Sequence, residues 1–122
     1  MKYRLTRLCL IIGIADRNLI INAMRTLESL TAVNNVLCVQ FREKVDSDGP
    51  YYITIQNGVG CSSIIGRYTD YTVDRTMILE TPSCLYTGIV MHELIHTLGN
   101  TTNYFLFVCL NIAHCLKNGV AE

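Results

Sequence analysis

Two histidines four positions apart, in the run His92-Glu93-Leu94-Ile95-His96, constrain this chain more than any other feature. Side chains four residues apart on an α-helix point in the same direction, and the surrounding apolar residues follow a helical pattern. We therefore expect a helix with one face in a core and both histidines on another face. Two imidazoles placed in this way can bind one Zn²⁺ ion, and the adjacent glutamate can take a proton from a zinc-bound water. This pattern is typical of zinc peptidases; the alternative is an ordinary helix with two histidines and a surface glutamate.

The motif by itself supplies too few ligands for a complete zinc site. A catalytic zinc has three protein ligands and one open position, whereas His92 and His96 are two. His114 follows later in the chain, within residues 106–117, which have the pattern of a helix. Nothing in this spacing is specific for a metal, so we favour the alternative that His114 is an ordinary residue of an apolar helix.

Length and composition predict one small domain. The chain has 122 residues, of which 50% are apolar and 16% charged, so it can bury a modest core. The formal net charge is zero and no basic stripe is present, which argues against nucleic acid or a membrane surface as the main partner. No apolar run is long enough for a transmembrane helix, so we expect no membrane span.

Cysteine is abundant in this chain. In an oxidising compartment the cysteines would pair, so we expect a secreted, extracellular protein with disulfide bonds. None of them forms a CxxC pair, which argues against a zinc site made of thiolates. Composition alone does not say which cysteines pair. The six cysteines are Cys9, Cys38, Cys61, Cys84, Cys109 and Cys115.

The first 15 residues allow two interpretations. Lys2, Arg4 and Arg7 precede an apolar run over residues 8–15, as in a short secretory signal peptide. Residues 8–14 are also a plausible first β-strand of the domain. We favour the strand, because the apolar run is short and Asp16 follows it directly.

Hydrophobic periodicity predicts an α+β fold. The first helix has Asp16 or Asn18 as its N-terminal cap, and the second is closed by Gly99. We expect a small twisted mixed sheet that packs on a backing helix and a zinc-binding helix. The predicted elements are helices over residues 16–31 and 86–98, strands over 36–41, 51–55 and 76–79, and a glycine-rich loop over 56–67.

Five segments extend the histidine motif into a family pattern. They read NAMRTLE (22–28), CVQF (38–41), YITI (52–55), GCSSIIGR (60–67) and CLYTGIVMHELIHTLG (84–99). From about Ile20 to Gly99 the chain resembles the N-terminal subdomain of an astacin-family zinc metalloendopeptidase, a metzincin. The glycine–cysteine loop and the extended histidine helix, in this order, are far more specific than the five-residue motif.

The resemblance implies roles for individual residues. His92 and His96 are expected to bind one Zn²⁺ ion per subunit, and Glu93 to act as the general base that activates the water. Cys61 and Cys84 are expected to form a disulfide that ties the glycine loop to the start of the zinc helix. The implied function is hydrolysis of peptide bonds in a protein or peptide substrate.

The resemblance also implies where the substrate lies. Thr76, Met77, Ile78 and Leu79 are expected to form the sheet edge on which an extended peptide adds as a further strand.

The sequence departs from the family pattern after Gly99. The family reads HExxHxxGFxHE, whereas this chain has Thr102 at the third histidine and Asn103 at the final glutamate. Threonine is a poor zinc ligand. We therefore expect a partial peptidase domain over residues 1–99, an unrelated apolar tail over 100–122, and an enzyme that Thr102 could leave inactive. The alternatives are a non-catalytic truncated remnant and a secreted peptide-binding module.

Overall fold

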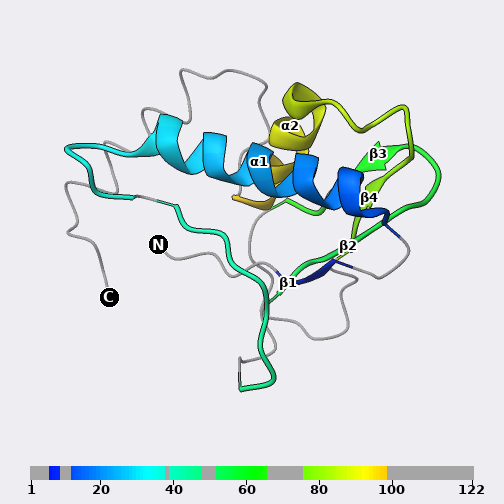
Figure 1. Cartoon of the computed structure of the whole chain (residues 1–122), viewed down its shortest axis with the longest axis horizontal. Helices are drawn as coiled ribbons and strands as arrows, with labels where there is room; N and C mark the ends of the chain where they lie inside the picture. The colour runs from blue at the N-terminus through cyan, green and yellow to red at the C-terminus, as the bar shows by residue number, and fades with distance from the viewer. Residues whose placement is uncertain (1–5, 9–11, 38, 48–51, 66–75, 99–122) are drawn as a thin grey trace.

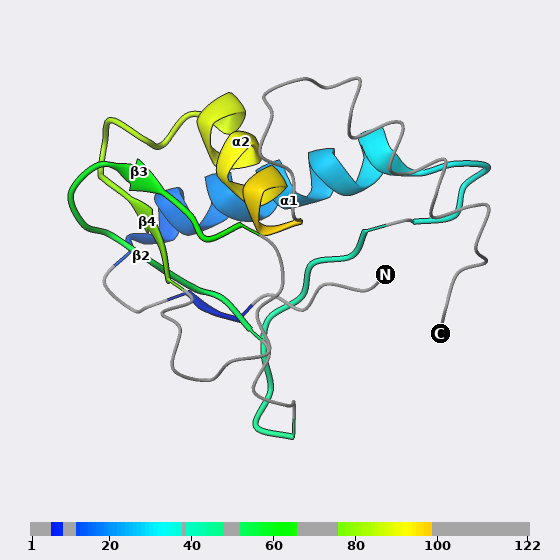
Figure 2. The ribbon, with the colours of Figure 1, turned by 180° about the vertical axis from the view of Figure 1, so that it is seen from behind.

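Two helices and a four-stranded mixed sheet make up the part of the chain that the structure describes. The computed structural model describes residues 6–8, 12–37, 39–47, 52–65 and 76–98. Figures 1 and 2 show α2 lying across α1 and beside β3. The predicted α+β fold is confirmed. The elements are β1 (Thr6–Leu8), α1 (Ile14–Thr31), β2 (Thr54–Gln56), β3 (Cys61–Ser62), β4 (Thr76–Leu79) and α2 (Thr87–Thr97).

The strand order in the sheet is β1-β2-β4-β3. The first three of these strands run parallel, and β3 is antiparallel to β4 at one edge. In this register Met77 lies opposite Ile55, and Leu79 lies opposite Cys61. Strand β4 pairs with β2 on one side and, through Ile78 and Leu79, with β3 on the other. The prediction that residues 76–79 form a sheet edge is therefore wrong.

The core lies between the helices and the strands. Helix α1 contributes buried residues at three- and four-residue spacing, so they line one face of the helix. Alternate residues of β2 and β4 point toward them. The fully or almost fully buried apolar residues of these elements are Ile20, Ala23, Met24, Leu27, Ile55, Met77, Leu79, Val90 and Leu94.

The predicted first helix is confirmed, but its start is not. Helix α1 begins two residues before Asp16, its N-cap is Gly13, and no side chain caps it. The predicted caps, Asp16 and Asn18, therefore lie inside the helix. It ends at Thr31 as predicted, and Asn34 and Asn35 then adopt positive φ angles of 52° and 61°.

The first strand lies earlier than predicted. Among the described residues it covers Thr6–Leu8, and it cannot reach residue 14 as predicted, because the carbonyl of Gly13 already accepts a helical hydrogen bond from Arg17 (2.9 Å) and Ile14 begins α1. Ile12, just before the helix, packs against the core. The signal-peptide alternative stays a prediction.

The strand predicted over residues 36–41 is wrong for the five of these residues that the structure describes. Val36 forms an isolated bridge back to Val33, across the turn of the two asparagines. Phe41 is buried, but its N–H donates to Glu28 Oε1 (2.5 Å) and its carbonyl accepts from Arg25 (2.8 Å). Side chains of α1 therefore supply the hydrogen-bond partners that a neighbouring strand would give the Phe41 backbone.

The remaining strands agree in part with the prediction. The strand predicted over residues 51–55 is β2, displaced to Thr54–Gln56. The predicted loop over residues 56–67 contains the edge strand β3, which pairs through two residues only. The strand Thr76–Leu79 is confirmed, and the helix predicted over residues 86–98 is α2, Thr87–Thr97.

Candidate metal centre

Helix α2 places the histidine motif on a firmly packed support. Its buried residues are Val90, Glu93, Leu94 and Thr97, which follow the i, i+3, i+4, i+7 pattern of one helix face. Val90 and Leu94 are fully buried in the core. The helix ends where the Leu98 N–H donates back to the carbonyl of Ile95 (3.1 Å). The predicted core position is confirmed for Val90 and Leu94, and His92 and His96 are only partly buried.

The structure brings the two predicted ligands together. The Nε2 atoms of His92 and His96 are 2.9 Å apart, and the ring planes are nearly perpendicular, at 86°. Two ligands about 2.0–2.1 Å from a tetrahedral zinc ion would be separated by about 3.3 Å. A shift of a few tenths of an ångström would therefore let both nitrogens bind one ion. A direct hydrogen bond between them instead requires one ring to donate and the other to accept.

Glu93 is the unusual polar residue of this site. It is 5% exposed, and its Oε2 atom is buried without a hydrogen-bond partner among the described residues. A buried carboxylate oxygen normally has partners, because losing its hydration costs free energy. An unpaired acceptor on the same helix as two converging imidazoles, one residue from His92 in sequence, fits a site that receives a water or a substrate N–H. The donor set therefore fits two ligands and the base of a zinc site.

The described residues do not complete the ligand set. Within the ranges that the structure covers, no group of three or more His, Cys, Asp or Glu side chains could hold a metal ion. Thr102, at the position of the family's third zinc ligand, and His114 lie outside the described residues. So do Gly99 and Asn103.

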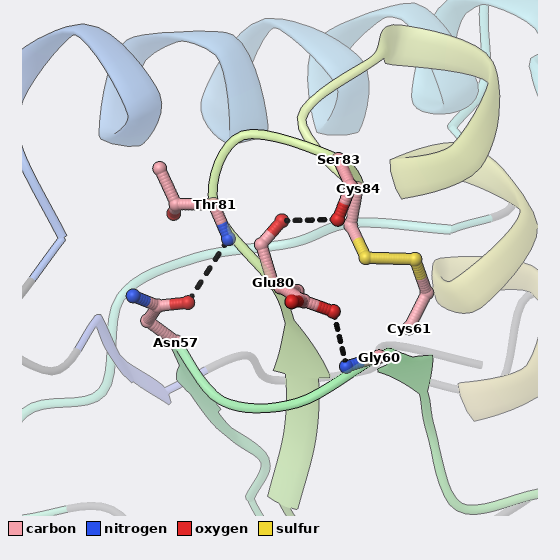
Figure 3. Close-up of a disulfide and its surroundings, with 7 residues drawn as sticks. All are labelled: Asn57, Gly60, Cys61, Glu80, Thr81, Ser83 and Cys84. Carbon is pink, nitrogen blue, oxygen red and sulfur yellow. Dashed lines mark hydrogen bonds between the residues drawn. A yellow bond between two sulfur atoms is a disulfide. The ribbon is translucent and has the colours of Figure 1, made fainter.

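The Cys61–Cys84 disulfide is present, as the family resemblance implied. Its Cα atoms are 5.8 Å apart, and it joins residues 23 positions apart in sequence. Figure 3 shows that it connects the start of β3 to the turn that leads into α2. The sheet edge and the histidine helix are therefore covalently linked. The other four cysteines lie outside the described residues.

Two polar residues near this disulfide were not predicted. Glu80 accepts a hydrogen bond from the Gly60 N–H (2.7 Å), and Asn57 accepts one from the Thr81 N–H (3.0 Å). Neither residue belongs to a local sequence motif. Their partners are 20 and 24 positions away, so only the strand register could have revealed them.

The mixed sheet, the backing helix and the HExxH helix together define a metallopeptidase-type domain. Comparison with known proteins identifies the family, because the model for the astacin peptidase family matches residues 11–103. The chain belongs to the astacin family. The match is longer at both ends than the resemblance seen between about Ile20 and Gly99 in the sequence.

Two curated relatives come from Caenorhabditis elegans. Zinc metalloproteinase nas-14 is 41% identical over 63 residues, which cover 51% of this chain and 12% of that protein. Zinc metalloproteinase nas-2 is 39% identical over 87 residues, covering 60% of this chain and 29% of that protein. The chain thus spans less than a third of the length of either relative.

A solved structure shares the fold. High choriolytic enzyme 1, a hatching enzyme zinc-protease from the medaka fish Oryzias latipes, superimposes with a TM-score of 0.66 at 23% sequence identity. The superposition covers 81% of this chain and 44% of the fish protein. It supports the assignment of these elements as part of an astacin-type fold. No helix in the described residues of our chain is long and apolar enough to cross a membrane.

Proposed function

We propose that this chain is a zinc-dependent endopeptidase of the astacin type, with His92 and His96 as zinc ligands and Glu93 as the general base. One observation carries the proposal: the histidine Nε2 atoms lie 2.9 Å apart on a helix that also carries a buried glutamate whose Oε2 atom has no partner among the described residues. When bound, zinc would supply a Lewis acid that polarises the scissile carbonyl and lowers the pKa of water.

The residues of the chain would divide the remaining work. His92 and His96, one helical turn apart on a helix anchored in the core, would fix the position of the ion. Glu93 would accept a proton at Oε2 without first breaking a hydrogen bond to another described residue, and then deliver it to the leaving amine.

The substrate in this proposal is an extended protein or peptide chain. Within the described residues, strand β3 is the antiparallel edge of the sheet, and an extended peptide could pair with its outer side by β-augmentation. The disulfide holds this strand next to the turn before α2. The substrate position that we propose is therefore β3 rather than Thr76–Leu79.

Secretion belongs to the same proposal. The Cys61–Cys84 disulfide and the high cysteine content favour an oxidising, extracellular compartment.

A non-catalytic peptide-binding module is the second candidate. Two histidines without a third ligand would bind zinc weakly, because each lost ligand removes much of the binding free energy. Thr102 stands where the family has its third histidine, which favours this candidate. The edge strand β3 would still be open to a peptide.

Zinc stoichiometry and cleavage of labelled casein separate the two candidates. We expect one zinc per chain for the wild type and for Glu93→Gln, and cleavage for the wild type alone, because the amide cannot act as a base. His92→Ala should lose zinc, whereas Glu43→Gln, at an exposed ion pair with Arg17, should change neither property. Peptide binding without zinc or cleavage would refute the endopeptidase and support the module.

A further inference from the structure

The loop over residues 57–60, between β2 and β3, is not held by hydrophobic burial. Its only apolar side chain, Val59, is 94% exposed, and two of its four residues are glycines. Gly60 has a φ angle of +79°, which side-chain-bearing residues rarely adopt. Polar contacts therefore help to fix this loop, and together with the disulfide at Cys61 they set the position of the edge strand that follows.

The strand register shows which contact is decisive. Cys61 pairs with Leu79 and Ser62 with Ile78, so the next pair of the antiparallel ladder is Gly60 with Glu80. In a regular pair of this kind, two residues exchange both backbone hydrogen bonds. The Glu80 N–H does donate to the Gly60 carbonyl (3.0 Å). The return bond is different: the Gly60 N–H donates to the Glu80 side chain, at Oε2 (2.7 Å).

The Glu80 carbonyl is engaged elsewhere, which explains this exchange. It accepts the Ser83 hydroxyl (3.5 Å; Figure 3) and the Cys84 N–H (2.8 Å), and these bonds shape the turn that leads into α2. The Glu80 carboxylate thus takes the place of the Glu80 backbone carbonyl as the acceptor of the Gly60 N–H. A single residue holds the edge strand on one side and the turn before the histidine helix on the other.

We propose that Glu80 is a positioning residue, which keeps β3 in register beside α2 so that an extended peptide can pair with the strand. This inference rests on the proposed function for the role of β3. Asn57 supports the same arrangement, because its Oδ1 accepts the Thr81 N–H and so ties the other end of the loop to the residue after Glu80. A charge-assisted hydrogen bond of the Glu80 kind is about twice as strong as a neutral one.

Amide hydrogen exchange in the metal-free full chain tests the hydrogen bond from the Gly60 N–H to the Glu80 side chain. Glu80→Ala should raise the exchange rate of the Gly60 amide at least tenfold, because its acceptor is lost. Glu80→Gln should keep the rate within threefold of the wild type, because the amide oxygen can still accept. The Cys84 amide, bonded to the Glu80 backbone, should not change in either variant. Unchanged Gly60 exchange in Glu80→Ala, or an equal rise in Glu80→Gln, would overturn the inference.

Casein cleavage tests the consequence for the substrate. Glu80→Ala should raise KM at least threefold and leave kcat within twofold, since the metal helix keeps its backbone and disulfide connections. Glu80→Gln and the exposed control Glu43→Ala should retain the wild-type KM. Faster Gly60 exchange with an unchanged KM would overturn the positioning role. A wild-type chain without zinc-dependent cleavage would contradict the proposed function, and Gly60 exchange would then decide the role of Glu80 in the strand register.

Discussion

Glu93 occupies a core position of α2, and replacing it should make the metal-free protein more stable. Val90, Glu93, Leu94 and Thr97 form one buried helix face, yet Glu93 carries an acceptor oxygen with no partner among the described residues. Removing an unpaired buried polar atom recovers about 1–3 kcal/mol. Glu93→Met replaces the carboxylate by an unbranched apolar side chain of similar length, which suits such a site. We expect the free energy of unfolding to rise by about 1–3 kcal/mol.

Urea denaturation followed by far-ultraviolet circular dichroism, with a chelator present, measures this change without a contribution from bound metal. In thermal denaturation under the same conditions, a gain of this size should raise Tm by about 4 °C or more. Glu93→Gln should give a smaller change, because it keeps a polar group at the buried position. Glu43→Met is the matched surface control, since the Glu43 side chain is 59% exposed and its ion pair with Arg17 should contribute less than about 1 kcal/mol.

A loss of stability in Glu93→Met would refute this reasoning. It would mean that the carboxylate stabilises the fold, and that its burial needs no functional explanation. A gain in stability, together with loss of casein cleavage, would show that the chain keeps a destabilising group at this position for its chemistry.

Two further changes test other parts of the fold by the same denaturation assay. Glu28→Ala should lower stability by about 2–4 kcal/mol, because it leaves the buried Phe41 N–H without its acceptor; a loss below about 0.5 kcal/mol would contradict this. Gly58→Ala should cost about 1–3 kcal/mol, because an added Cβ would lie 2.8 Å from Ile78 Cγ2. Gly88→Ala is its control, since nothing lies within 4 Å of the added atom and alanine favours the helix; equal losses in both variants would exclude the clash as the cause.

Local periodicity predicted the helices well because each helix hydrogen-bonds within itself. The apolar spacing from Ile20 to Leu27 determines the buried face of α1, and the spacing around His92 and His96 determines the orientation of α2. The convergence of the two imidazoles follows directly from a four-residue separation on a helix. This part of the candidate site could therefore be predicted from five consecutive residues.

The strands were predicted less well because their partners are distant in sequence. Residues 36–41 have the composition of a strand, but the backbone of Phe41 bonds to side chains 13 and 16 positions earlier. Strand β3 is too short for any alternation to be visible. The interior position of Thr76–Leu79 depends on a neighbour that the sequence does not reveal. The disulfide was expected only through the family resemblance, since composition does not select a pairing.

At two places where regular structure is short, a glutamate carboxylate accepts a hydrogen bond from a backbone N–H. The strands have only two to four residues, so few backbone bonds fix the segments beside them. Glu28 supplies an acceptor to the Phe41 N–H, and Glu80 supplies one to the Gly60 N–H. Glu28 is 4% exposed, whereas Glu80 is only partly buried. Because salt screens exposed charges more than buried ones, the contact at Glu80 should weaken first as ionic strength rises. The edge strand beside the candidate metal centre would then loosen while the packing of α1 against the Phe41 segment persists.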